Sequence, residues 1–199
     1  MSDVIIVLFI GYGIGNFATS YILGKILKKT DIRKHGSGNA GATNALRVFG
    51  IKLAAATFVI DALKGVLAVI IGNSILGPLG GLIGGVSAVI GHNWPVVLKF
   101  KGGKGIASTI GVVATINYQI ALVCVIIGLI IVVKTRYVSL GSIIAISLLP
   151  ILSVIMIKPF DLNFFVFSLV LTAMAIFRHR SNIRRLINGN ELKLGQKAL

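Results

Sequence analysis

Two glycine-rich segments of this sequence combine backbone amides, hydroxyl groups and basic side chains in a pattern typical of anion binding. The first reads GSGNAGATNALR from Gly36 to Arg47, and the second reads KGGKG from Lys101 to Gly105. Glycines let the backbone approach a ligand closely, amides at a helix start donate to anions, and an arginine can hold a phosphate through two hydrogen bonds. Both segments therefore predict phosphate-binding loops. Each one alone is also compatible with a basic turn that faces anionic lipid.

A histidine and a serine are further candidates for chemistry. His179 follows Arg178 at the end of an apolar run, where its imidazole could act as a general base or as a hydrogen-bond donor. Ser142 stands just inside another apolar run, close enough to the basic start of that run for its hydroxyl to point back at the same site. A serine at such a position also serves helix packing, so both interpretations stay open.

The rest of the sequence limits the chemistry to cations, hydroxyls, amides and a histidine. The fifth residues after the three histidines are Ala40, Val97 and Arg184, so no HxxxxD motif exists. The sequence also lacks HExxH and CxxC motifs and any carboxylate cluster, and we expect neither a metal nor a cofactor. The basic residues lie in short loops without interleaved aromatic residues, which argues against nucleic acid as a partner.

Asp61 and Lys64 lie three residues apart within an apolar run. An unpaired charge at the centre of a membrane costs about 2.5 to 3.5 kcal/mol, so we expect the two side chains to pair with each other or to face the protein interior. A structural pair is the main expectation, and a role in the site is the alternative. His92, at the start of the helix-breaking sequence HNWP, is also assigned a structural role.

The elements that must position these residues are apolar enough to lie in a membrane. Hydrophobic residues make up 56% of the 199 residues and the mean hydropathy is +0.97, which is outside the range of soluble domains. A span needs about 20 apolar residues. We therefore predict an all-α polytopic membrane protein that forms a single domain over 1–199 in contact with membrane lipid. The apolar runs cover 4–23, 53–71, 75–98, 106–133, 140–157 and 162–177.

The placement of basic residues predicts the topology. They give a formal net charge of +15 and gather in segments 24–52, 99–105, 134–139 and 178–199, which the positive-inside rule places in the cytoplasm. As one helix, 106–133 would be about 42 Å long in a hydrocarbon core of about 30 Å. We therefore expect two short helices that turn near Asn117 and Tyr118, seven spans in all, an external N-terminus and a cytoplasmic C-terminus. The alternative is a tilted or re-entrant segment and five or six spans.

Two local patterns concern packing and the membrane surface. Small residues recur four apart at Gly11/Gly15, Gly80/Gly84 and Gly81/Gly85, a spacing that predicts close contact between helix backbones. Segment 181–188 places apolar residues on one helical face and arginines on the other, and Gly189 follows as a helix end. We expect this segment to form a short helix on the cytoplasmic membrane interface.

Three longer segments resemble a known family. GSGNAGATNALR at 36–47, GHNWPVVLKFKGGKGIA at 91–107 and RHRSNIRRLINGNE at 178–191 resemble, in the same order, the signature segments of the bacterial acyl-phosphate-dependent glycerol-3-phosphate acyltransferases, the PlsY family. The resemblance implies transfer of a fatty acyl group from acyl phosphate to the 1-hydroxyl of sn-glycerol 3-phosphate. The products are lysophosphatidic acid and phosphate, in the first acylation of phospholipid synthesis. The resemblance also implies a location in the bacterial inner membrane, with the active site on the cytoplasmic face. We further expect the protein to be a monomer.

The loop chemistry and the resemblance together assign the site residues. We expect catalytic roles for four of them, namely His179, Ser142, Asn182 and Lys104. Glu191 matches an architectural position of the third segment, so it joins Asp61, Lys64 and His92 as a structural residue. The expected substrate phosphate ligands are Ser37, Asn39, Thr43, Asn44, Arg47, Gly102, Gly103, Lys104 and Arg178.

Two questions stay open at the level of the sequence. With no carboxylate in the three segments suited to deprotonate the glycerol hydroxyl, the base is either His179 or the phosphate of the acceptor itself. The competing function is an organic-phosphate transporter, because cations in a helical bundle also select anions. The cations gather on one face and no internal repeat is evident, which disfavours transport. A lipid-binding scaffold without catalysis is the third reading.

Overall fold

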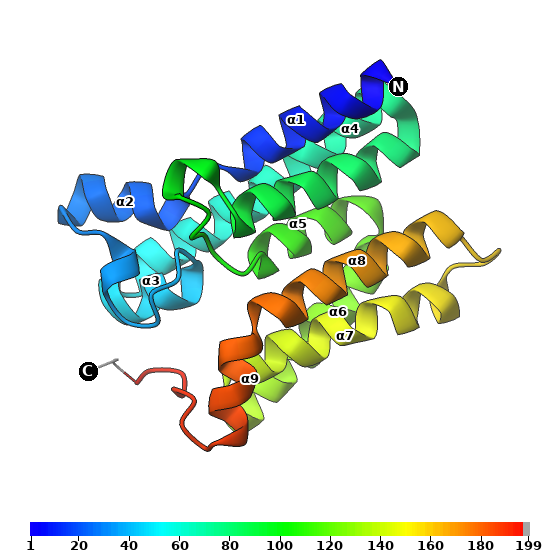
Figure 1. Ribbon diagram of the computed structural model, residues 1–199. Coiled ribbons are helices and arrows are strands. Elements are labelled where there is room, and N and C mark those ends of the chain that lie inside the picture. The colour runs from blue at the N-terminus through cyan, green and yellow to red at the C-terminus, as the bar shows by residue number, and fades with distance from the viewer. Residues whose placement is uncertain (197–199) are drawn as a thin grey trace. The chain divides into compact units, whose positions relative to one another are not determined.

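The computed structural model describes residues 1–196, and every regular element in that part of the chain is helical, which confirms the all-α class (Figure 1). Lys197 and its two successors, which end the predicted cytoplasmic segment 178–199, lie outside the described residues. In chain order the elements, with η for a 3-10 helix, are α1 (Ser2–Gly15), α2 (Thr19–Lys28), η1 (Ile32–Lys34), α3 (Ala42–Phe49), α4 (Ile51–Asn93), η2 (Val96–Leu98), α5 (Ile106–Ile116), α6 (Tyr118–Thr135), α7 (Val138–Met156), α8 (Leu162–Arg178) and α9 (Arg180–Ile187).

The chain contains two compact units. The N-terminal unit is Met1–Val112, with Gly195 and Gln196 grouped to it, and the C-terminal unit is Val113–Leu194. The first holds α1 to α4 and the start of α5, and the second holds α6 to α9. The predicted site residues are divided between the two units. The single membrane domain expected over 1–199 stays a prediction.

Helix α4 bends sharply and supplies two helical segments, 51–75 and 78–93, that run back along each other (Figure 1). The backbone leaves helical geometry at Leu76 and at Gly77, whose φ is +60°, and Pro78 follows. A glycine with positive φ ends one helix at little cost, and a proline suits the first turn of the next. Beyond the bend the segments touch, because a Cβ on Gly80 would contact the carbonyl oxygen of Gly72.

The small-residue patterns pack helices against each other, as the sequence predicts. A Cβ on Gly11 would lie 2.6 Å from the carbonyl oxygen of Gly84, and one on Gly15 would lie 2.9 Å from the carbonyl carbon of Ala88. Larger side chains at these positions would separate the backbones of α1 and α4. The glycines therefore fix α1 directly on α4 within the N-terminal unit.

The apolar run 4–23 does not form one continuous helix, although the stretch Ser2–Lys28 that contains it is long and apolar enough to cross a membrane. Helix α1 ends at Gly15, and the Asn16 side chain binds the backbone of α1 and of η2. Its Nδ2 donates to the carbonyl of Tyr12 (2.7 Å), and its Oδ1 accepts from the amide of Val96 (2.7 Å). Side-chain amides compete in this way with the hydrogen bonds of a helix. The break joins α1 to η2.

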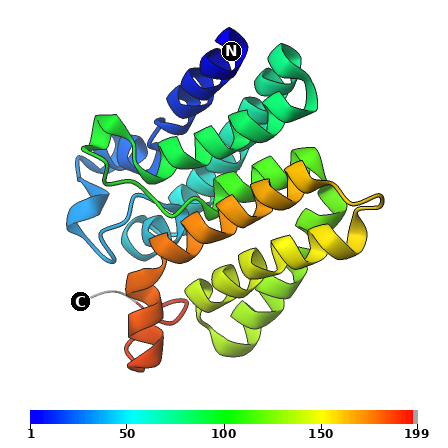
Figure 2. The ribbon, with the colours of Figure 1, turned by 45° about the vertical axis from the view of Figure 1, so that its right-hand side comes forward.

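In the C-terminal unit, α7 contacts both α6 and α8 (Figures 1 and 2). The break expected near Asn117 is confirmed, because α5 ends at Ile116 and the Asn117 side chain caps α6 by accepting from the amide of Ile120 (3.0 Å). Helices α6 and α7 approach closely at two glycines: a Cβ on Gly141 would lie 2.6 Å from the carbonyl oxygen of Gly128.

Within residues 1–196, four helical stretches are long and apolar enough to cross a membrane, namely Ser2–Lys28, Ile51–Leu98, Tyr118–Thr135 and Val138–Met156. A fifth arises if α8 and α9, which meet at a bend of 58°, form one broken span, and α5 is a shorter apolar helix. The stretch Ile51–Leu98 contains the bend of α4 and thus two helical segments. The count of seven spans and the orientation of the termini stay predictions.

The short helix expected over 181–188 is present as α9. Asn188 ends it, and Gly189 follows with a φ of +71°, the left-handed conformation that suits a glycine after a helix. Ile187 is 79% exposed, while Asn182 on the first turn of the helix is buried. One side of α9 therefore packs inward, and its location on a membrane surface stays a prediction.

Candidate functional site

The first glycine-rich loop is shaped by Asn44, whose side chain is buried under it. Asn44 Oδ1 accepts from the amide of Ser37 (2.8 Å), and a Cβ on Gly36, whose φ is +60°, would contact this oxygen. With all its polar atoms bound to the backbone, Asn44 holds the loop rather than projecting from it. Its Nδ2 donates to three loop carbonyls, those of Ile32 (3.2 Å), His35 (3.0 Å) and Asn39 (3.0 Å).

The other predicted ligands of this loop are half-buried and gather around the start of α3. Asn39 Nδ2 donates to the carbonyl of Ser37 (3.2 Å) and to its Oγ (3.3 Å), which keeps these two side chains together. Gly41 precedes α3, so no side chain caps the amides of the first turn. Thr43 and Arg47 lie four residues apart and thus on one face of α3. The arrangement suits an anion at the helix start.

Arg33 and Asp31 form a clamp that the sequence reasoning missed. Arg33 Nε and Nη2 donate to the two oxygens of Asp31 (3.0 and 2.8 Å), and Nη1 donates to the carbonyl of Leu98 (3.0 Å). The Arg33 guanidinium lies 5.0 Å from the centre of the Tyr21 ring. Hydrogen bonds from Arg33 hold the pKa of Asp31 below its ordinary value. The available signal was that Asp31 is the only acidic residue in the basic segment 24–52.

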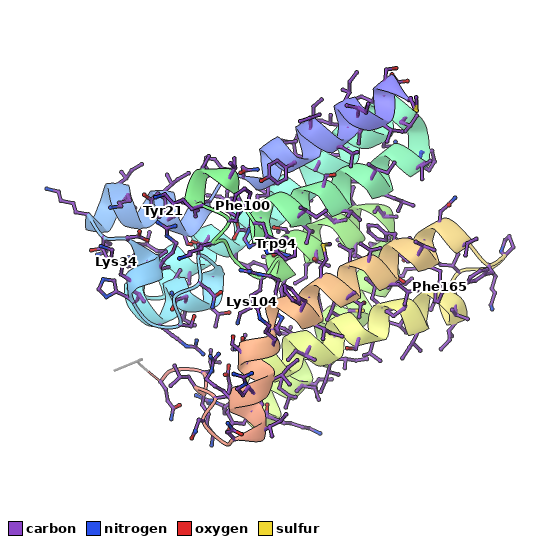
Figure 3. All side chains as sticks on the ribbon, in the orientation of Figure 1. Tyr21, Lys34, Trp94, Phe100, Lys104 and Phe165 are labelled. Atoms are coloured by element: carbon purple, nitrogen blue, oxygen red, sulfur yellow. The ribbon has the colours of Figure 1, made fainter. Side chains whose placement is uncertain are left out.

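The second glycine-rich loop lies between η2 and α5 and contains Lys104 (Figure 3). The amide of Gly103 donates to the carbonyl of His92 (3.1 Å). A Cβ on Gly102 would lie 3.0 Å from the carbonyl oxygen of Asn93, and one on Gly103 would lie 3.0 Å from that of Ala40. Both glycines are buried, whereas Lys104 is half-buried. The Ala40 contact and the Arg33 clamp show that the two glycine-rich loops interlock within the N-terminal unit.

His179 occupies the junction of α8 and α9 in the C-terminal unit and is 2% exposed. Its Nδ1 lies 2.8 Å from the carbonyl oxygen of Ala175. A carbonyl only accepts, so Nδ1 carries a hydrogen, and in the neutral imidazole the lone pair is on Nε2. Nε2 is therefore the atom that can accept a proton. Arg178, half-buried, ends α8 beside it.

Glu191 binds side chains from two helices of the C-terminal unit. Its Oε1 accepts from Ser139 Oγ (2.8 Å) and from Asn182 Nδ2 (2.7 Å), and its Oε2 accepts from Arg185 Nε (2.7 Å). Burial raises the pKa of Glu191, but these hydrogen bonds outweigh burial and hold the pKa below its ordinary value. Sequence reasoning singled out Ser142 and missed Ser139. Ser142 Oγ donates to the carbonyl of Val138 (2.9 Å), and its oxygen keeps the capacity to accept.

The structure thus brings the predicted residues together in two groups. The expected pair of Asp61 and Lys64 is confirmed, with Oδ1 and Nζ 2.9 Å apart.

Among residues 1–196, no group of three or more His, Cys, Asp or Glu side chains has the arrangement of a metal site. The N-terminal unit holds Ser37, Asn39, Thr43, Asn44, Arg47, Asp61, Lys64, His92, Gly102, Gly103 and Lys104, and the C-terminal unit holds Ser142, Arg178, His179, Asn182 and Glu191.

Curated relatives match nearly the whole chain. The sequence profile of the glycerol-3-phosphate acyltransferase family matches residues 5–189. The chain is similar to the glycerol-3-phosphate acyltransferase of Thermoanaerobacter pseudethanolicus, with 52% identity over 188 residues and 94% of each chain covered. It is similar to the enzyme of the same name from Alkaliphilus metalliredigens, with 48% identity over 193 residues and 97% of each chain covered.

Solved structures match as well. One is the crystal structure of PlsY (YgiH), an integral membrane glycerol 3-phosphate acyltransferase, in its glycerol 3-phosphate form, with a TM-score of 0.89, 36% identity and 96% of both chains covered. The other is its lysophosphatidic acid form, with a TM-score of 0.86, 35% identity, and 96% of this chain and 95% of that chain covered. With a family profile, curated relatives and solved structures in agreement over nearly its full length, the chain belongs to the PlsY family of glycerol-3-phosphate acyltransferases.

Proposed function

We propose that this chain transfers a fatty acyl group from acyl phosphate to the 1-hydroxyl of sn-glycerol 3-phosphate, with lysophosphatidic acid and inorganic phosphate as products. Membership of the family supports acyl transfer to glycerol 3-phosphate. The two forms of the solved relative, one with glycerol 3-phosphate and one with lysophosphatidic acid, support the same acceptor and product. The observation that carries the proposal is the pair of interlocked glycine-rich loops, one of which leads into α3 with Arg47, while the other carries Lys104 next to the buried Gly102 and Gly103.

Both proposed substrates carry phosphate, so the enzyme must bind two anions that repel each other. Arginine and lysine side chains, together with amides that point at the anions, offset this repulsion in a site shielded from water. Asn44 we assign to shaping the first loop, because its polar atoms already bind the backbone. We assign phosphate binding to Ser37, Asn39, Thr43, Arg47, Gly102, Gly103, Lys104 and Arg178.

The reaction needs no covalent enzyme intermediate, because an acyl phosphate is already activated. The hydroxyl oxygen of glycerol 3-phosphate attacks the acyl carbon, the bond from that carbon to the phosphate oxygen breaks, and the phosphate leaves with both electrons of the bond. The hydroxyl proton passes either to His179 Nε2 or to the phosphate of the acceptor. Ser142 and Asn182 orient the reactants in this scheme, and Lys104 stabilises the negative charge of the leaving phosphate.

The setting that we propose is the bacterial inner membrane, with seven spans, an external N-terminus and a cytoplasmic active site. The apolar stretches of the structure and the integral membrane relative support a multi-pass protein. The basic segments support the orientation, because basic loops remain on the cytoplasmic side. We further propose that the enzyme acts as a monomer without a metal or a cofactor.

The donor is tested with purified protein in lipid. Glycerol 3-phosphate is supplied with acyl phosphate, acyl-CoA or acyl-carrier protein in separate reactions, and lysophosphatidic acid and phosphate are followed. We expect turnover with acyl phosphate alone. Arg47→Ala and Lys104→Ala should each lower kcat/KM by about a hundredfold or more, since each removes a charge that binds a phosphate.

The matched control is Lys28→Ala, which removes the same charge from an exposed position on α2 and should retain wild-type turnover. Turnover with acyl-CoA or acyl-carrier protein would contradict the proposed donor. A folded preparation that binds glycerol 3-phosphate, turns over no donor and moves glycerol 3-phosphate into sealed vesicles would replace catalysis by transport.

A further inference from the structure

A buried ionic cluster lies directly behind the second glycine-rich loop. The side chains of Asp61, Lys64 and His92 are 2%, 5% and 6% exposed. Lys64 Nζ lies 2.9 Å from Asp61 Oδ1, 2.7 Å from His92 Nδ1 and 2.9 Å from the carbonyl oxygen of Phe17. Thr19 Oγ1 donates to the same Asp61 oxygen (2.8 Å). The carboxylate and the ammonium therefore compensate each other without solvent.

The ammonium of Lys64 dictates the protonation of His92. An ammonium has three hydrogens to donate and cannot accept. Its contacts are to Asp61 Oδ1, to His92 Nδ1, to the carbonyl oxygen of Phe17 and, at 3.2 Å, to that of Gly15. Nδ1 must therefore accept, and the neutral imidazole carries its hydrogen on Nε2. Thr19 and the backbone carbonyls alone could satisfy a purely structural Asp61–Lys64 pair. One hydrogen of Lys64 nevertheless goes to the His92 ring, which reaches the loop.

The other edge of His92 faces the backbone of the loop. A Cβ on Gly103 would contact His92 Nε2, so this nitrogen lies directly against the Gly103 backbone. The carbonyl of His92 also accepts from the amide of Gly103 (3.1 Å). The residue thus holds Gly103 from two sides, with its main chain and with its ring, immediately before Lys104.

We infer that His92 is a positioning residue of the phosphate-binding loop, with its tautomer and ring orientation set by the buried Asp61–Lys64 pair. The imidazole fixes Gly103 relative to the two helical segments of α4. It thereby also fixes the amides and the Lys104 side chain that follow Gly103. This role rests on the proposed function, in which Gly102, Gly103 and Lys104 bind a substrate phosphate. It predicts that the two edges of the ring have separable effects.

Two substitutions of His92 test the two edges of its ring separately. In His92→Asn the amide oxygen replaces Nδ1 as the acceptor for Lys64, but the side chain no longer reaches Gly103. We expect a melting temperature close to wild type, a KM for a phosphate substrate raised about three- to tenfold with a smaller change in kcat, and faster tryptic cleavage after the exposed Lys101. In His92→Gln the amide reaches toward Gly103 but no longer serves Lys64, so we expect a lower melting temperature and a KM raised less than in His92→Asn.

A second pair of variants tests the same contact from the side of the loop and does not depend on His92→Gln. Gly103→Ala places a methyl group against His92 Nε2 and should raise KM, whereas the shorter side chain of His92→Asn leaves room for it. We therefore expect the effect of Gly103→Ala on KM to be at least threefold smaller in the His92→Asn background than in wild type. Additive effects in this cycle would overturn the inference.

The matched control removes a buried hydrogen bond of the C-terminal unit. Thr172→Val in α8 loses the bond from Thr172 Oγ1 to the carbonyl of Ile146 (2.9 Å), and we expect a lower melting temperature with unchanged KM and unchanged cleavage after Lys101. Equal KM shifts in this control and in His92→Asn would mean that His92 contributes only to the general stability of the fold. Cleavage after Lys101 needs no turnover, so a wild-type protein without acyl transfer would refute the proposed function while the cleavage rates still decide the role of His92.

Discussion

At the scale of single residues, one hydrogen bond decides what His179 can do. Its Nδ1 is committed to the carbonyl of Ala175, so only Nε2 can take a proton in the neutral ring. The residue is also the link between α8 and α9, and its buried position keeps competing water away. In the proposed role as the base, the ring would be oriented before any substrate binds.

We expect His179→Ala to lower kcat about a hundredfold at about pH 7, with little change in the KM for glycerol 3-phosphate. The reason is that the ring would act on the transferred proton and not on the phosphate. Steady-state kinetics with acyl phosphate measure both constants, and the melting temperature shows whether the variant folds. A variant that keeps most of its kcat would exclude the histidine and leave the acceptor's phosphate as the base.

The sequence singles out the proposed binding residues more readily than the residues that shape the loops. Arg47 and Lys104 stand out because basic and glycine-rich stretches are conspicuous in an apolar chain. Asn44, Arg33 and Ser139 do not, because their role depends on which backbone atoms or carboxylates a turn brings near them. A polar residue in a loop looks the same in sequence whether it binds a ligand or the loop.

At the scale of elements, Glu191 is the point where the end of the chain fastens α9 to α7. It accepts from Asn182 and Arg185 of α9 and from Ser139 of α7. Removal of its charge would leave three donors without their shared acceptor, a change that costs about 1 to 3 kcal/mol for a buried group. The carboxylate thus stabilises the segment that carries His179.

We expect the stability of the protein to depend on pH through Glu191. The pKa in the folded state lies below the ordinary value of 4.5, so the ionised carboxylate stabilises the fold above that value. This contribution is lost as the pH falls through the lower, folded-state pKa. Glu191→Gln should therefore melt below wild type at about pH 7 and lose less stability on acidification. Melting curves from about pH 7 to pH 3 measure this, with exposed Asp3→Asn as the control that keeps the wild-type profile.

The breaks between elements divide into those with a local signal and those without one. The break at Gly77 and Pro78 follows from the backbone preferences of these two residues. The break at Asn117 follows from its side-chain cap on an amide three residues away, and it is predictable from the sequence. The break at Asn16 is not, because its amide is held by Val96, which is distant in the sequence. Length and hydropathy alone read this stretch as one helix.

At the scale of the whole molecule, composition and the length of the apolar runs predict a helical membrane protein, and the all-helical structure, its apolar stretches and the integral membrane relative bear this out. The predicted topology follows from a different physical rule, the retention of basic loops on the cytoplasmic side. It is open to a direct test because the chain has one cysteine, Cys124, in α6. Its replacement by serine gives a background for single cysteines.

We expect Ser2→Cys and Tyr118→Cys to react with a membrane-impermeant maleimide in right-side-out vesicles, and Lys101→Cys to react only after the membrane is opened. Tyr118 is 69% exposed and stands at the turn between α5 and α6. Protection of Tyr118→Cys, with Ser2→Cys still labelled, would favour the re-entrant segment and fewer spans. Labelling of Lys101→Cys from outside would reverse the orientation.

The clamp between the two loops limits how this sequence can change over evolutionary time. Asp31 and Arg33 are 12% and 24% exposed at their side chains, so the loss of either leaves a partly buried charge unpaired. Substitutions at these two positions should therefore be accepted together or not at all. Leu98 takes part only through its carbonyl, and its buried side chain can drift among apolar residues of similar volume. The distance between the loops is therefore kept by the Asp31–Arg33 ion pair and by the carbonyl oxygen of Leu98.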